Sequence, residues 1–233
     1  MQIHGFNKTT LLDYPKHLAA TIFLGCCNFR CPFCHNSSLV LSTDTQPSLT
    51  VSEVLDTLKS RSSILEGVCI TGGEPTLSKD LPEFIQVIKN IGLKVKLDTN
   101  GSNPLMLQYL LSQQLLDYIA MDIKNSRARY IETIGVPGYS LDAIDASISL
   151  IQNSGIPYEF RTTVVKEYHS LEDMLAIGRW LEGSKEYYLQ LFLDSGDILS
   201  PGLHAPTQET MVEYQEALQP YFNTVGIRGM ETN

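Results

Sequence analysis

Cys27-Asn28-Phe29-Arg30-Cys31-Pro32-Phe33-Cys34 follows a mostly apolar run at 18–24 and brings three cysteines together on one short stretch. A short apolar run bounded by such a loop is typical of a buried strand. Three thiolates on one loop suit a [4Fe-4S] cluster that leaves one iron without a protein ligand. An iron of that kind can bind a small molecule. We therefore expect Cys27, Cys31 and Cys34 to hold such a cluster.

A structural zinc site is another metal centre that this loop allows. Zinc sites usually use four ligands, often as two separated pairs. The sequence has no second pair, because Cys69 lies alone and His35 directly follows Cys34. A spacing that starts at Cys26 instead of Cys27 matches the opening of plant ferredoxins, but it needs a distant fourth cysteine that only Cys69 could supply. We therefore expect a three-cysteine cluster and assign no role to Cys26.

The composition is that of an ordinary globular protein with a large core: 233 residues, 43% hydrophobic and 18% charged. The formal charge of -9 argues against nonspecific binding to nucleic acid or to anionic membranes. No run approaches the roughly 18 apolar residues of a membrane span, and residues 1–10 lack the apolar core of a signal peptide. We expect a cytoplasmic protein, where clustered cysteines are more often metal ligands or catalytic than disulfide partners.

Strand-like and helix-like patterns alternate along the chain. Short apolar or β-branched runs predict strands at 19–24, 67–71, 94–98, 118–123, 158–164 and 187–192, with a seventh at 224–227. Apolar residues at helical spacing predict helices over 51–58, 84–88, 141–151, 171–181 and 211–218, the first with a capping box at Thr50 and Glu53. We expect one domain over 1–233, with a lead-in at 1–17 and the first strand and cysteine loop at 18–36.

Polar motifs stand at the ends of successive predicted strands. After the cysteine loop come Gly72-Gly73-Glu74-Pro75, Asp98-Thr99-Asn100-Gly101 and Met121-Asp122-Ile123-Lys124. Parallel α/β folds build their sites at the carboxyl ends of strands. Four consecutive strands can share one site if the sheet curls. The sequence therefore favours an α/β fold with a partial (β/α)6 TIM-like barrel over an open doubly wound sheet.

The residues in these motifs have chemistry suited to a charged ligand. Gly72 and Gly73 permit close approach of the backbone to a ligand, and the Glu74 carboxylate can accept hydrogen bonds from an ammonium group. Asp98 and Asp122 would repel each other unless a cation lies between them.

Two basic residues belong to the same region. Lys124 points the same way as Asp122 because side chains alternate along a strand. Arg161 lies inside a predicted strand, where an unpaired charge is costly, so we expect it to face the site.

The cysteine spacing, with Phe33 before the last cysteine, resembles the radical S-adenosylmethionine (SAM) superfamily, and Gly72-Gly73-Glu74-Pro75 resembles its GGEP motif. The resemblance implies a [4Fe-4S] cluster and SAM as cofactors, with the open iron binding the amino and carboxylate groups of SAM. It also implies reductive cleavage of SAM to methionine and a 5′-deoxyadenosyl radical. It places Phe33 near the adenine and the GGEP residues beside the SAM amino group.

A narrower resemblance is to the glycyl-radical-enzyme activases, including pyruvate formate-lyase activating enzyme. It is carried by the stretches 97–101 and 121–124. It implies that Asp98, Thr99, Met121 and Asp122 help to hold a monovalent cation, Na+ or K+, beside the SAM carboxylate. Lys124 and Arg161 match positions near SAM in the same family.

The likeness over the whole chain is greatest to the anaerobic ribonucleoside-triphosphate reductase activating proteins. It starts in Gly5–Pro15, continues through Cys34-His35-Asn36 and 160–165, and reaches 187–190. It implies an enzyme that generates a glycyl radical on a partner, expected to be an anaerobic ribonucleotide reductase, with reduced flavodoxin or ferredoxin as electron donor. Cys26 is a departure, because relatives usually have glycine there.

Other functions stay open at this point. One is a radical SAM enzyme for a small molecule, similar to the deazapurine synthases. Others are an activase of another glycyl radical enzyme, such as pyruvate formate-lyase, and a non-catalytic metal-binding protein. The remaining cysteines are too few for a second [4Fe-4S] cluster, which disfavours activases with ferredoxin-like inserts. His4, His17, His169 and His204 show no ligand spacing.

Overall fold

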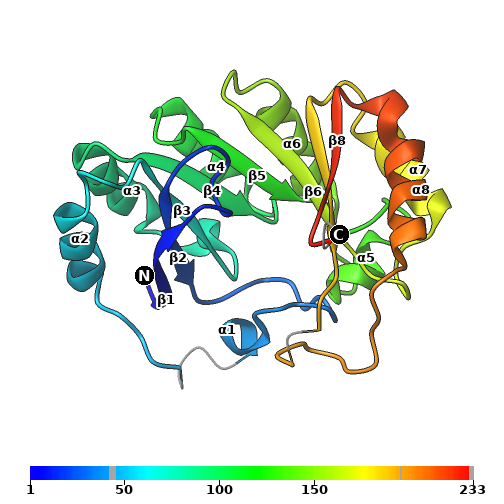
Figure 1. The fold of residues 1–233 in the computed structure, drawn as a ribbon, viewed down its shortest axis with the longest axis horizontal. Helices are drawn as coiled ribbons and strands as arrows, with labels where there is room; N and C mark the ends of the chain where they lie inside the picture. The colour runs from blue at the N-terminus through cyan, green and yellow to red at the C-terminus, as the bar shows by residue number, and fades with distance from the viewer. Residues whose placement is uncertain (42–45, 195, 231–233) are drawn as a thin grey trace.

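The computed structural model describes residues 1–41, 46–194 and 196–230, which form one curved sheet flanked by helices (Figure 1). Within this part of the chain the sheet has eight strands in the order β1-β2-β3-β4-β5-β6-β7-β8. Pairing is parallel from β2 to β8. Strands that follow one another in this order are wound in one direction only. The doubly wound alternative is therefore wrong, and the predicted partial barrel is confirmed.

The predicted strands all form, with small shifts at their ends. The parallel strands are β2 (Ala19–Leu24), β3 (Gly67–Gly72), β4 (Lys94–Thr99), β5 (Tyr118–Asp122), β6 (Tyr158–Val164), β7 (Glu186–Leu191) and β8 (Thr224–Arg228). The ends of β2 and β6 coincide with the predicted ones. Strand ends are the least certain part of a prediction from sequence.

The N-terminal lead-in contains a strand that the sequence pattern does not predict. β1 (Ile3–Thr10) pairs antiparallel with β2, with shifts in register after Ile3 and after Asn7. It has no run of apolar residues, because most of its side chains are at least partly exposed. β1 and β8 lie at the two edges of the sheet, so the barrel is not closed.

The five predicted helices are α2 (Val51–Ser60), α3 (Leu81–Asn90), α6 (Asp142–Gln152), α7 (Leu171–Trp180) and α8 (Gln208–Leu218). The capping box of α2 is present, since Thr50 Oγ1 accepts from Glu53 N and the Glu53 carboxylate accepts from Thr50 N. Within the described residues, three helices were not predicted: α1 (Ser37–Leu41), α4 (Pro104–Ser112) and α5 (Tyr130–Ile134). Single turns of 3-10 helix occur at Pro75–Leu77 and Gln219–Tyr221.

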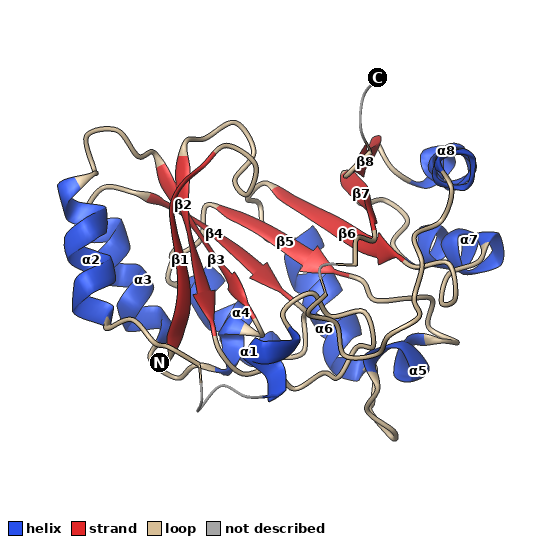
Figure 2. Cartoon of the chain, turned by 60° about the horizontal axis from the view of Figure 1, so that its bottom comes forward, coloured by secondary structure: helices blue, strands red, loops and turns tan. Residues whose placement is uncertain are grey.

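The two faces of the sheet differ in chemistry. The outer face packs against the helices, as Figures 1 and 2 show, and residues such as Ile70, Leu97 and Phe160 belong to one buried apolar cluster. Alternate residues point into the barrel, where Lys96 and Glu159 are buried. The hydrophobic core therefore lies outside the barrel, and polar side chains line its interior. No helix of the described ranges is both long and apolar enough to cross a bilayer.

Candidate functional site

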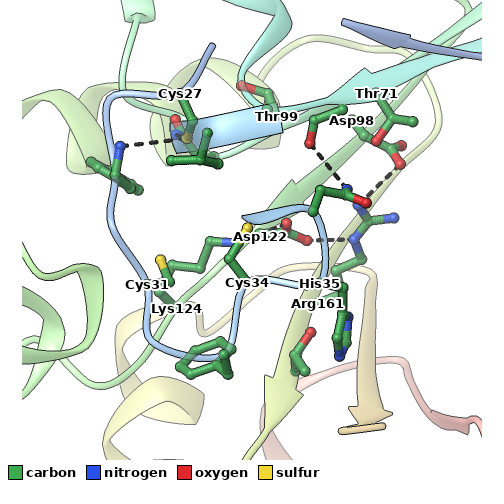
Figure 3. Close-up of a pocket in the computed structure, with 18 of the residues that line it drawn as sticks. Cys27, Cys31, Cys34, His35, Thr71, Asp98, Thr99, Asp122, Lys124 and Arg161 are labelled. Atoms are coloured by element: carbon green, nitrogen blue, oxygen red, sulfur yellow. Dashed lines mark hydrogen bonds and ion pairs between the residues drawn. The ribbon is translucent and has the colours of Figure 1, made fainter. Parts of the chain in front are cut away.

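The cysteine loop leaves β2 and curls back over the barrel mouth (Figure 3). Phe29 and Phe33 are buried, and their rings contact Tyr139 and Tyr168. The loop is also fixed through Arg30, whose backbone N–H donates to the Ile134 carbonyl at 2.8 Å. Aromatic packing and backbone hydrogen bonds thus set the loop's path. The thiols are left to face the pocket.

The three predicted cluster ligands line one pocket. Burial raises the pKa of the Cys27 thiol to about 11 and that of Cys31 to about 12. Both thiols are therefore protonated at neutral pH until a metal displaces the proton. Among the described residues, no three His, Cys, Asp or Glu side chains converge on the position of a single metal ion.

Gly72 and Gly73 allow the cysteine loop to lie directly on β3. Gly73 N donates to the Leu24 carbonyl at 2.8 Å, and Glu74 N donates to the Cys26 carbonyl at 2.7 Å. A Cβ at Gly72 would lie 2.2 Å from the Leu24 oxygen, and one at Gly73 would lie 2.0 Å from the Cys26 oxygen. Both positions therefore require glycine for close packing, and both also line the pocket.

Glu74 lies behind the pocket wall, not among the residues that line the pocket. Its carboxylate is 1% exposed. Oε1 accepts from Thr76 N at 3.1 Å, from the Thr76 hydroxyl and from Thr99 Oγ1 at 2.8 Å; Oε2 accepts from Asn100 N at 2.6 Å. Burial raises the pKa of Glu74, although these hydrogen bonds act in the opposite direction. The carboxylate joins the ends of β3 and β4 and has no contact with the cavity.

The charged residues that the sequence singles out come together in the pocket that the thiols line, with Lys124 beside Cys31 and Cys34 (Figure 3). The guanidinium of Arg161 lies between two carboxylates: Nη2 donates to Asp98 Oδ2 at 3.0 Å and Nε donates to Asp122 Oδ1 at 2.5 Å. Lys96 donates to the other oxygen of Asp98, and Lys124 donates to the other oxygen of Asp122 at 2.9 Å. Each carboxylate thus has two cationic partners.

These ion pairs control the charge state of the site. Burial alone would raise the pKa of Asp98 and Asp122, but Arg161, together with Lys96 or Lys124, lowers both below the ordinary range. The pKa of Lys124 shifts in the opposite direction: burial would lower it, but the interactions with Asp122 help to raise it above the ordinary value. All five groups are therefore charged at neutral pH.

The predicted monovalent cation would share its position with a cationic side chain of the protein. Arg161 already supplies positive charge between Asp98 and Asp122. Thr99 Oγ1 is engaged with Glu74, and the Met121 side chain packs in the core against Gly101. A Na+ or K+ ion here stays a prediction, and the neighbouring charges do not require it.

Several pocket residues were not assigned from sequence. They are Phe29, His35, Asn36, Val40, Thr71, Asn100, Thr163 and Gln190. Asn100 ties β4 to the cysteine loop, since its Nδ2 donates to Asn28 Oδ1 at 3.0 Å and lies 3.8 Å from Cys27 Sγ. A polar residue between apolar neighbours on a strand, as Gln190 is between Leu189 and Leu191, is a signal that could have identified part of this wall.

The pocket fits a cluster with SAM. The fit lies in the chemistry of its lining; the cavity volume is about 200 Å³. Three thiols, the donor type that iron–sulfur clusters use, line it together with charged groups and glycine backbone. His35 Nε2 is buried and has no hydrogen-bond partner in the described part of the chain, so a donor or acceptor is left for a ligand.

Known proteins provide independent evidence. The sequence matches the family model described as "Radical SAM superfamily" over residues 21–181. A Methanocaldococcus jannaschii protein named "Putative glycyl-radical enzyme activating enzyme" is 31% identical over 232 residues, with 97% of this chain and 95% of that protein aligned. The "GTP 3',8-cyclase" of Helicobacter pylori is 29% identical over 206 residues, which cover 82% of this chain and 57% of the cyclase.

Among solved structures, SuiB of Streptococcus suis bound to S-adenosylmethionine has a similar fold. The TM-score is 0.69 at 14% identity, with 91% of this chain and 52% of SuiB covered. At this level of identity the match shows a shared fold.

Proposed function

The chain belongs to the radical SAM superfamily, and we propose that it is a glycyl-radical-enzyme activase whose partner is an anaerobic ribonucleoside-triphosphate reductase. Full-length similarity supports the activase assignment most strongly, since 97% of this chain aligns with 95% of the activating-enzyme relative. The cyclase match covers little more than half of that enzyme. The choice of reductase as partner rests on the sequence resemblance alone.

Two kinds of residue line one pocket, thiols and charged side chains. Cys27, Cys31 and Cys34 would hold the [4Fe-4S] cluster and leave one iron open for SAM. Arg161 and Lys124 present positive charge that attracts a carboxylate, and the glycine pair offers backbone groups to an amino group. These roles would orient SAM at the cluster.

A cluster held by Cys27, Cys31 and Cys34 would supply the one-electron reduction needed to cleave SAM, which is the chemistry required to form a glycyl radical on the partner. The protein's own contribution is to hold charge in fixed positions. Asp98 and Asp122 keep the Arg161 guanidinium between them. That cation is therefore in place before SAM arrives, which reduces reorganisation during the reaction.

The test uses anaerobically reconstituted protein, SAM, a chemical reductant and a candidate reductase. We expect a glycyl-radical signal in electron paramagnetic resonance on the reductase, and none when its radical-site glycine is replaced by alanine. Cys27→Ala, Cys31→Ala and Cys34→Ala should each abolish SAM cleavage, whereas Cys26→Ala should retain it. An active Cys31→Ala variant would contradict the cluster assignment.

A small-molecule substrate is the second candidate, favoured by the cyclase match over 82% of this chain. The same assay separates the two functions. SAM cleavage that depends on GTP or another small molecule, with no radical on any candidate reductase, would replace the activase proposal.

A further inference from the structure

Glu159 and Arg228 form an ion pair inside the barrel, next to the proposed SAM site. Glu159 lies on β6 and is fully buried, and Arg228 is the last residue of β8. The two nitrogens of Arg228 donate to the two oxygens of Glu159: Nη1 to Oε1 at 2.6 Å and Nη2 to Oε2 at 2.7 Å. The Tyr118 hydroxyl donates to Oε2 at 2.9 Å. Such a two-pronged contact fixes both orientation and distance.

One oxygen of Glu159 also lies near Arg161, the residue between Asp98 and Asp122. Arg161 Nη1 lies 3.9 Å from Glu159 Oε1, the oxygen that Arg228 Nη1 also contacts. The other nitrogens of Arg161 contact Asp98 and Asp122. The Arg161 guanidinium therefore faces three carboxylates, and its position depends on how strongly each attracts it.

We propose that Arg228 is a positioning residue, which acts through Glu159 to keep the Arg161 guanidinium between Asp98 and Asp122. While Arg228 neutralises Glu159, that carboxylate exerts little pull on Arg161. Without Arg228, a buried carboxylate would lack its main partner, and Arg161 would be the nearest remaining cation. Arg161 would then shift toward Glu159 and away from the pocket side. This inference rests on the proposed role of Arg161 in SAM binding.

The surroundings keep Arg228 in place for this task. Its guanidinium lies over the Tyr188 ring, 3.7 Å from the ring centroid, a contact that favours one plane for the guanidinium. Its side chain is 33% exposed, so water can reach one side of it, whereas Glu159 is fully buried. Loss of Arg228 therefore leaves a buried carboxylate without its main partner, whereas loss of Glu159 leaves a guanidinium that water can still solvate.

The experiment measures SAM affinity of the cluster-loaded protein by calorimetry, without any partner enzyme, together with thermal unfolding. Arg228→Met should weaken SAM binding by about tenfold, the lower end of what outer partners of a site contribute. Adding Glu159→Gln to that variant should restore affinity to within about threefold of wild type, because the competing charge is gone. Glu159→Gln alone should also bind within about threefold, and Arg228→Lys should fall between wild type and Arg228→Met.

The matched control is Arg127→Met. Arg127 also pairs with a carboxylate, Asp145, and lies over an aromatic ring, Trp180, but on the outer surface. It should leave SAM affinity unchanged.

If Arg228 had a structural role alone, SAM affinity would fall in proportion to the loss of thermal stability. The double variant Arg228→Met/Glu159→Gln would then not recover SAM affinity. The proposal is overturned if Arg228→Met binds SAM as wild type does, or if Arg228→Met/Glu159→Gln is as weak as the single variant. If Arg228→Met does not fold, the test uses Arg228→Lys instead. Unchanged SAM affinity in Arg228→Lys overturns the proposal. Weaker SAM binding in Arg228→Lys that Glu159→Gln restores in the double variant supports it. A wild type that binds SAM normally but gives no radical on the reductase contradicts the proposed function and leaves this inference standing.

Discussion

Glu74→Gln separates a structural role of this carboxylate from a role in contacting SAM. The carboxylate has two oxygens, and each accepts from a different backbone N–H: Thr76 N on Oε1 and Asn100 N on Oε2. A glutamine has one oxygen. Whichever way its amide is turned, its NH2 group must face one of these N–H donors.

The loss is one buried backbone hydrogen bond in a site that is 1% exposed. Leaving a buried donor unsatisfied costs about 1–3 kcal/mol. For a chain of this size, 1 kcal/mol corresponds to a change in Tm of about 2–4 °C. We therefore expect Tm to fall by about 4–8 °C for a loss of about 2 kcal/mol, with SAM affinity within about threefold of wild type.

Circular dichroism of the anaerobic holoprotein gives Tm, and calorimetry gives the SAM affinity. Glu53→Gln is the matched control, because that carboxylate also accepts from a backbone N–H, that of Thr50, but in solvent. It should change Tm only slightly. An unchanged Tm for Glu74→Gln together with SAM binding weakened by more than about tenfold would refute the reasoning, since it would mean that the carboxylate contacts SAM directly.

Three other changes test separate parts of the molecule. The ion pairs hold the pKa of Asp98 and Asp122 below the unfolded value of about 3.9, so their contribution to stability is present above about pH 4 and is lost as the pH falls through the folded values. Urea unfolding between pH 5 and 2 should show this loss, and Asp98→Asn should reduce it; an identical pH profile would contradict the pairing. Gly73→Ala places a Cβ 2.0 Å from the Cys26 oxygen and should cost about 1–3 kcal/mol while lowering the iron content after reconstitution, so full iron loading would speak against this close packing. Thr50→Ala removes the capping box of α2 and should cost about 1 kcal/mol in urea unfolding with no change in iron content.

The parallel strands could be predicted because most of them carry short apolar or β-branched runs, as in Ala19–Leu24. β1 could not, because an edge strand with exposed side chains has no such run. α4 was missed for a related reason, since a short helix with apolar residues on several sides has weak periodicity.

In the site, too, features set by a local sequence pattern could be predicted, and features set by contacts between distant segments could not. Cysteine spacing located the thiols, and alternation along strands correctly paired Asp122 with Lys124. The contact of Glu74 with SAM stays a prediction; its carboxylate accepts from Asn100 N just after β4, a contact that no local pattern predicts. Glu159 and Arg228 are far apart in the sequence, and no local pattern predicts their contact.

The contacts that fix the cysteine loop have a consequence for the timing of assembly. Ser200 N donates to the Pro32 carbonyl at 3.0 Å, and Ser37 N donates to the Asp197 carbonyl at 3.4 Å. The loop that the ribosome makes early is thus held by a segment that it makes late. Contacts so distant in sequence form slowly, after the intervening chain has folded. The cysteine loop accordingly lacks these two contacts until residues 197–200 have been made, and we expect the cluster to be inserted after that.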